Sequence, residues 1–317
     1  MAWTVGRWLL RWLIGMAVCA PMVTSLTGCA WLDRTQRAAI YRPSQTFDDK
    51  FKGLSSGDEQ FYLMLNEPQG AARAELPVAE LGAEPAPYVG AWWMPAASPQ
   101  APTLLYFHGV FRNLTHNHPK LVALREAGFS VLAISYRGWP FSSPALPSEQ
   151  SIYEDAMRAV TELKRRQPNP CKRLLYGHSM GGGVAVEVAS RLSYPADYAG
   201  LMLESTFTAL ADVATEQRWY AWMLKPVQSQ YFDSLSKIEH VAAPLLVRHG
   251  LADQTVPFAL GRRLFDAAPP HAFPRQWIAF EGGSHSGLHT EFPDRYRSSA
   301  WAFWTDLSAQ PLSCYLN

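Results

Sequence analysis

The sequence predicts an α/β fold: a mostly parallel sheet with helices on both faces and a small helical lid. From residue 103 onward, short apolar runs that predict strands alternate with longer stretches that predict helices. A Gly-His-Ser-Met-Gly turn at 177–181 stands between one such strand and helix. A single long interruption, about 206–243, is too rich in aromatic residues for a solvated loop. Successive strand–helix units place functional residues at the carboxyl ends of parallel strands.

The elements follow from the pattern in chain order. A lead-in without visible chemistry covers 29–58, and two strands are expected at 61–65 and 88–94, joined by a Pro/Ala/Gly-rich connection. Further strands are predicted at 103–108, 129–135, 173–176, 201–204, 245–249 and 277–280. Helices are predicted at about 119–127, 149–167, 180–192, 257–268 and 293–308.

Length and composition indicate one catalytic domain. A chain of 317 residues that is 48% hydrophobic and 17% charged can bury one sizeable core. Its net charge of +1 gives no basis for a nucleic-acid partner. No feature of the sequence defines the oligomeric state.

The N-terminus is predicted to be a targeting segment. Arg7 and Arg11 precede an apolar stretch at 13–23, and Leu26-Thr27-Gly28-Cys29 follows. This run resembles the lipobox of bacterial lipoproteins, in which the cysteine is acylated and becomes the first residue of the mature protein. The resemblance implies a signal peptide at 1–28 and a lipid, palmitate included, on Cys29.

The residue after that cysteine bears on location. Ala30 rather than Asp implies, from the lipoprotein resemblance, sorting to the outer membrane of the cell envelope, facing the periplasm. An ordinary secretory peptide or an uncleaved anchor are the alternatives. The apolar stretch is interrupted by Pro21 and is short for a membrane span.

The remaining cysteines are predicted to pair. Cys19 leaves with the signal peptide and Cys29 carries the lipid, so Cys171 and Cys314 are left in a compartment that permits disulfides. Cys171 precedes the strand that leads to the Gly-His-Ser-Met-Gly turn, and a final helix antiparallel to the strands brings Cys314 to the same edge. Two unpaired thiols are the alternative.

Ser179 is the predicted nucleophile. The Gly-x-Ser-x-Gly pattern between a strand and a helix is typical of a nucleophile elbow, in which the serine hydroxyl projects from a strained turn. Gly177 and Gly181 permit the close approach of the adjoining strand and helix. A flexible turn is the alternative interpretation.

A serine hydroxyl needs a base and an acid that orients the base, in the chain order serine, acid, histidine. His285 follows the last predicted strand and is the expected base, with His289 as the runner-up. Asp253 follows the preceding strand and is the expected acid, with Glu204 as the fallback. The predicted catalytic set is therefore Ser179, Asp253 and His285.

The oxyanion hole is expected to use two backbone N–H groups. Met180, directly after the nucleophile, supplies one; Val110, in the loop after the strand at 103–108, supplies the other, with Phe111 as the near alternative. Gly109 allows the loop to approach closely.

A metal or cofactor is not predicted. His108, His116 and His118 lie close together in sequence, but no zinc-type Cys/His spacing accompanies them. We interpret the stretch as the oxyanion loop followed by a helix beginning at Pro119.

The stretch 104–289 resembles the α/β-hydrolase superfamily, and within it the bud-emergence (BEM) type and the serine-aminopeptidase-like branch. The matching pieces are Leu105–Gly109, Ser135–Gly138, Pro147–Glu149, Tyr176–Gly182, Glu204–Thr208, Lys237-Ile238, Val256-Pro257 and Gly283–His285. The resemblance implies a Ser-Asp-His hydrolase over 59–317 with a lid at about 206–243. The runs at 110–112 and 139–141 depart from the family pattern.

Three functional hypotheses follow. The first is a membrane-anchored hydrolase of small carboxylic esters that forms an acyl-enzyme on Ser179. The second is a peptidase or amidase with the same catalytic set, which needs an acidic group for the substrate ammonium; the lid offers Asp212, Glu216 and Asp233. The third is a binding lipoprotein on a hydrolase scaffold, which would have no need of the complete set.

Overall fold

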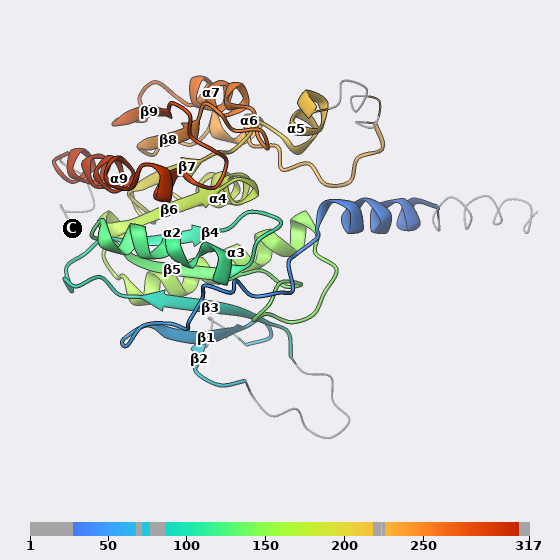
Figure 1. Cartoon of the computed structure of the whole chain (residues 1–317), viewed down its shortest axis with the longest axis horizontal. Helices are drawn as coiled ribbons and strands as arrows, with labels where there is room; N and C mark the ends of the chain where they lie inside the picture. Colours follow the sequence, from blue (N-terminus) through green and yellow to red (C-terminus); the bar gives the residue numbers. More distant parts are fainter. Residues whose placement is uncertain (1–27, 68–71, 77–85, 218–222, 224–225, 311–317) are drawn as a thin grey trace, which may run out of the picture.

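A nine-stranded sheet forms the centre of the molecule (Figure 1). The structure is a computed structural model that describes residues 28–67, 72–76, 86–217, 223 and 226–310. The strand order is β2-β1-β3-β5-β4-β6-β7-β8-β9, parallel from β5 to β9, with β1, β2 and β3 antiparallel to their neighbours. The bounds are β1 Glu59–Met64, β2 Ala72–Arg73, β3 Tyr88–Met94, β4 Thr103–Phe107, β5 Ser130–Ser135, β6 Arg173–His178, β7 Gly200–Glu204, β8 Leu245–Gly250 and β9 Arg275–Phe280.

Helices cover both faces of this sheet, which confirms the predicted fold class. Leu104 and Tyr106 of β4 lie on the sheet face that α2 and α9 cover, whereas Leu105 and Phe107 lie on the face that α3, α4 and α7 cover. The helix bounds are α2 Leu114–Glu126, α3 Glu149–Arg166, α4 Met180–Arg191, α5 Leu210–Gln217, α6 Leu235–Ile238, α7 Phe258–Ala267, α8 Leu288–Glu291 and α9 Pro293–Ser308, with a helical turn at Pro170–Lys172.

The predicted start of α2 is wrong. The helix begins at Leu114 because the Asn113 side chain accepts a hydrogen bond from the Thr115 N–H and caps it. Pro119, the predicted first residue, lies inside the helix. The sequence patterns also missed the short strand β2 and a helix at 28–40, here called the N-terminal helix.

The insertion between β7 and β8 holds α5 and α6 within its described residues. Cys171 precedes β6, at the edge of the sheet where the parallel strands begin, and it is buried and disulfide-bonded. Its predicted partner Cys314 lies outside the described residues, as does Cys19, so the pairing of Cys171 with Cys314 stays a prediction.

The topology fixes where a site can form. From β4 the chain passes to β5 on one side, and β6 then pairs with β4 on the other side. The loops that follow β4 and β6 therefore diverge at the carboxyl ends of the strands, which is where parallel sheets of this kind bind ligands. We call this side of the sheet the catalytic edge, because Ser179 directly follows β6 there.

The close packing of α4 on β4 gives a stability prediction. A Cβ added to Gly181 would overlap the backbone carbonyl of Phe107, whereas one added to Gly183 would meet only side-chain atoms, of Phe232 and Ser234, at 3.3 Å. Gly181→Ala should lower the free energy of unfolding by about 2 kcal/mol. Gly183→Ala, in the same helix, should leave it unchanged or raise it because alanine favours helix. Chemical denaturation measures both; equal effects would contradict the packing argument.

Candidate active site

Ser179 occupies a strained turn between β6 and α4. Its backbone has φ +57° and ψ −124°, a conformation that non-glycine residues rarely adopt. The surroundings hold it there: its N–H donates to the Glu204 carbonyl at 2.9 Å, and its own carbonyl accepts from the Thr206 hydroxyl at 2.9 Å. A Cβ at Gly177 would overlap the Gly181 backbone, so the strand and helix can meet only through glycines.

The structure brings the three predicted catalytic residues together. The Ser179 hydroxyl lies 3.0 Å from His285 Nε2, and His285 Nδ1 lies 2.7 Å from an Asp253 carboxylate oxygen. His285 comes from the loop after β9 and Asp253 from the loop after β8. The Nδ1–H donates to the carboxylate, which leaves Nε2 as the acceptor for the serine proton.

The loop around Asp253 keeps its carboxylate ionised. One oxygen accepts hydrogen bonds from the backbone N–H groups of Thr255 at 2.9 Å and Val256 at 2.8 Å. Burial alone would raise the pKa of Asp253, but hydrogen bonds from His249 and His285 lower it below its ordinary value. The lowered pKa favours the ionised form of Asp253 beside the histidine.

The loop after β4 lies against the nucleophile, as the oxyanion hypothesis requires. A Cβ placed on Gly109 would stand 3.2 Å from the Ser179 Cβ. Within the described part of the chain, neither the Val110 N–H nor the Met180 N–H donates a hydrogen bond. Both backbone donors are therefore available to a negative charge that develops near Ser179.

Aromatic side chains hold this oxyanion loop in place. The Trp139 indole N–H donates to the Val110 carbonyl at 3.1 Å, and the Tyr136 hydroxyl donates to the His108 carbonyl at 3.2 Å. The His108 ring lies 4.4 Å from the Tyr136 ring, and burial lowers the pKa of His108 to about 4. His108 is a neutral packing residue here.

Glu204, the fallback acid, has a different environment. Its carboxylate is fully buried, forms an ion pair with Lys120 of α2 and accepts from the hydroxyl of Tyr296 at 2.9 Å. Burial would raise the pKa of Glu204, but the positive charges of Lys120 and Arg248 lower it well below its usual range. It makes no hydrogen bond to His285 among the described residues, so the geometry favours Asp253 as the acid.

His178 is a site residue that the sequence reasoning did not single out. It is buried directly before Ser179, and its Nε2 lies 3.0 Å from the His285 carbonyl oxygen. A carbonyl oxygen only accepts, so Nε2 carries the proton and fixes the tautomer. Burial first, and then the positive charge of Lys120, lower the pKa of His178 well below its ordinary value. This neutral ring joins the nucleophile turn to the loop that carries the base.

The other histidines have separate roles. Burial lowers the pKa of His289 to about 4, and its ring packs 6.0 Å from the Tyr296 ring, away from the Ser179 hydroxyl that His285 contacts. His116 hydrogen-bonds the Asn113 side chain and His118 packs on Phe51. In the described residues, no group of three or more His, Cys, Asp or Glu side chains is placed to hold a metal ion.

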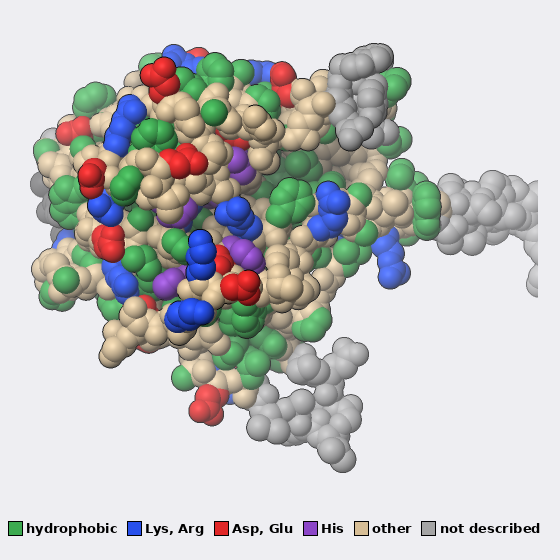
Figure 2. Space-filling view, in the orientation of Figure 1, with side chains coloured by type: hydrophobic (Ala, Val, Ile, Leu, Met, Phe, Trp, Pro, Cys, Tyr) green, Lys and Arg blue, Asp and Glu red, His purple; other side chains and the backbone are tan. Residues whose placement is uncertain are grey.

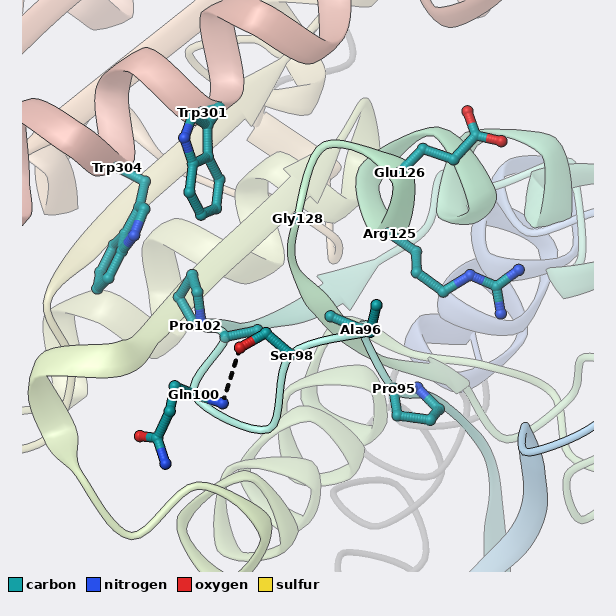
Figure 3. Close-up of a pocket in the computed structure, with 12 residues that line it drawn as sticks. Pro95, Ala96, Ser98, Gln100, Pro102, Arg125, Glu126, Gly128, Trp301 and Trp304 are labelled. Carbon is teal, nitrogen blue, oxygen red and sulfur yellow. Dashed lines mark hydrogen bonds between the residues drawn. The ribbon is translucent and has the colours of Figure 1, made fainter.

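A cavity of about 590 Å³ lies away from this chemistry (Figure 3). Its walls include Pro102, which precedes β4, Gly128, which precedes β5, and Trp301 and Trp304 of α9. These residues mark the edge of the sheet opposite Ser179, so we assign the cavity no part in the site.

Sequence comparisons identify relatives of the chain. A family model described as serine aminopeptidase, S33 matches residues 98–237. An uncharacterized protein of Mycobacterium tuberculosis is 33% identical over 201 residues, which cover 62% of this chain and 68% of the relative. The lysophosphatidylserine lipase ABHD12 of Rattus norvegicus is 32% identical over 229 residues, covering 65% and 55% respectively. The chain thus spans about half the length of that lipase.

Solved structures share the fold at low sequence identity. The Pyrococcus furiosus esterase Pf2001 superposes with a TM-score of 0.60 at 16% identity, covering 84% of this chain and 98% of the esterase. Est1E from Butyrivibrio proteoclasticus, bound to ferulic acid, gives a TM-score of 0.55 at 14% identity, covering 71% and 97%.

The sheet, the nucleophile turn and the serine, histidine and aspartate beside it define the class of protein: an α/β-hydrolase. The chain belongs to the α/β-hydrolase superfamily and shares a family with the mycobacterial protein. The predicted superfamily is confirmed.

The contrast between the two carboxylates gives a prediction. Glu204→Gln should lower the free energy of unfolding by about 3 kcal/mol or more, because Lys120 and Arg248 would lose their buried counter-charge. Asp266→Asn, which breaks an exposed pair with Arg262, should change stability little. Thermal and denaturant unfolding of both variants test this, and a stable Glu204→Gln protein would refute the role given to the buried carboxylate.

Proposed function

We propose that the chain is a serine hydrolase that cleaves carboxylic esters of lipid-like substrates through an acyl-enzyme on Ser179. The observation that carries the proposal is the bridging position of His285, 3.0 Å from the Ser179 hydroxyl and 2.7 Å from Asp253. The relatives named lysophosphatidylserine lipases support an ester of a single-chain lipid.

The geometry supports a two-stage reaction. The Ser179 oxygen attacks the ester carbonyl carbon while its proton passes to His285 Nε2, and the Val110 and Met180 N–H groups bind the resulting oxyanion. The intermediate collapses, and the departing alcohol takes the proton from His285. Water then attacks the acyl-enzyme with His285 as the base, and the acid leaves as Ser179 regains its proton.

A peptidase is the second candidate, because the matched family model is described as a serine aminopeptidase. Such an activity needs an acidic group beside the nucleophile to bind a substrate ammonium. The Asp212 carboxylate of the lid accepts a hydrogen bond from Thr208 and lies 3.8 Å from Arg263, which opposes cation binding. Turnover of aminoacyl amides above that of acyl esters would establish the second candidate.

The nucleophile prediction tests the mechanism. Ser179→Ala should lower ester turnover by about 10⁴-fold and abolish labelling by a fluorophosphonate probe, because the triad acts as a unit. Asp253→Asn should lower turnover by a similar factor while the protein stays folded. A panel of esters of increasing chain length, assayed with the intact chain, serves as the reference. Near-normal turnover by Ser179→Ala would end the proposal.

The envelope location is the second part of the proposed function. The resemblance to bacterial lipoproteins, like the finer resemblance to the bud-emergence type, rests on sequence motifs, and Cys29 is exposed and not disulfide-bonded. The described residues hold no helix that is long and apolar enough to span a bilayer. A thioether-linked lipid on Cys29 would hold the domain at the membrane surface.

This location gives its own prediction. Cys29→Ala should abolish incorporation of radiolabelled palmitate and leave the chain uncleaved, because only the thiol can accept the lipid. Cys171→Ala is the control that removes a cysteine without affecting the label. Mass spectrometry of an unmodified mature chain that begins at another residue would remove the lipoprotein proposal.

A further inference from the structure

Large apolar side chains are exposed around the catalytic edge. They come from separate segments: the oxyanion loop, the loop before α3, the insertion after α5, the loop after β8 and the N-terminal helix. These side chains are Trp31, Phe111, Leu146, Val227, Tyr231 and Leu251. Large apolar side chains that are exposed in several segments at one edge of a protein indicate an interaction surface.

The N-terminal helix is held against this edge by specific hydrogen bonds. The Gln36 amide donates to the Val227 carbonyl at 2.6 Å, and the Arg37 guanidinium donates to the Pro147 carbonyl at 2.7 Å. The Tyr41 hydroxyl donates to the Gln230 side chain at 2.9 Å. Figure 1 shows the helix leaving the body at this edge, and Figure 2 shows green apolar side chains with blue Lys or Arg side chains beside its junction with the body.

The charged groups in these segments include three arginines as well as the Asp233 carboxylate. Arg34, Arg42 and Arg112 are exposed and make no ion pair within the described chain. The Arg42 guanidinium lies 5.6 Å from the centre of the exposed Phe111 ring. The nearby Glu149 carboxylate is already engaged, because it accepts the backbone N–H of Phe232 at 2.9 Å. Apolar side chains mixed with free arginines fit a membrane surface that carries anionic headgroups.

The residues that precede the N-terminal helix in the sequence also indicate a membrane as the partner of this surface. The described part of the N-terminal helix starts at residue 28, next to exposed Cys29, and the sequence before it includes the apolar stretch at 13–23. Either a lipid on Cys29 or that stretch would approach the molecule from the catalytic edge. We propose that the catalytic edge docks on a lipid bilayer with anionic headgroups and presents Ser179 to esters within it. The substrate part of this inference rests on the proposed function; the docking does not.

Hydrogen–deuterium exchange on the full chain, with and without vesicles, tests the docking directly. Vesicles of equal parts phosphatidylcholine and phosphatidylglycerol should slow exchange in 226–231 and 250–258 as well as in the N-terminal helix. Exchange should not change at 271–273, which precede β9, or at 299–304, which hold the cavity residues Trp301 and Trp304 of Figure 3. Protection confined to 28–40 would show an anchor without docking and overturn the proposal.

Matched variants test what docking does for turnover. Trp31→Glu and Val227→Glu should each lower hydrolysis of a lipid ester held in these vesicles by about tenfold or more, through lost apolar burial. Phe273→Glu and Trp301→Glu change exposed apolar side chains on the opposite edge and should have no such effect. All four should hydrolyse a soluble short-chain ester at the rate of the unsubstituted protein. Equal losses on both edges would overturn the proposal.

The arginines separate electrostatic from apolar contributions. Arg34→Gln and Arg42→Gln should each weaken the vesicle-dependent activity by about fivefold with anionic vesicles, and have no effect with phosphatidylcholine alone. The same loss on neutral vesicles would refute the headgroup contact. The experiments distinguish failure of the docking proposal from failure of the proposed function. If no ester is hydrolysed but vesicles still protect the catalytic edge from exchange, only the proposed function is removed.

Discussion

The buried carboxylate of Glu204 is the constraint on which the rest of the site depends. Its side chain joins Lys120 of α2 to Tyr296 of α9, and Arg248 of β8 lies 3.6 Å away. Its backbone carbonyl accepts the Ser179 N–H. One residue thus ties the helices on one face of the sheet to the turn that carries the nucleophile. Because a buried charge without its partners is costly, the elements that supply those partners must stay in register.

Two carboxylates at the ends of neighbouring strands, those of Glu204 and Asp253, have different roles. Glu204 is the last residue of β7, and the buried cations Lys120 and Arg248 neutralise its carboxylate, so it organises the interior. Asp253 follows β8 and faces the loop of His285, where its negative charge can stabilise an imidazolium. The positions of Glu204 and Asp253 in the strand order do not reveal which of the two is the catalytic acid. The ion pair between Glu204 and Lys120 of α2 does, and no local sequence pattern encodes that contact.

The sequence therefore predicted the parts of the site that local patterns encode. Ser179 stands in a recognisable strand–turn–helix, and Asp253 and His285 follow strands in the expected chain order. Lys120 and His178 were missed, because a lysine on a helix and a histidine inside a motif look ordinary until tertiary packing places them. The start of α2 was misplaced because Pro119 was weighted above the cap at Asn113. The N-terminal helix was missed since its hydrogen-bond partners lie about 190 residues away.

That missed helix links the chain's proposed anchor to its chemistry. It contacts the insertion through Val227 and Gln230, and Gln230 also accepts the N–H of Glu149 at the start of α3. The N-terminal helix is therefore attached to segments at the catalytic edge. A parallel sheet places its reactive loops on one side only. An anchor on that side shortens the path from a membrane-held ester to Ser179, whereas one on the opposite edge would hold the nucleophile a full domain away.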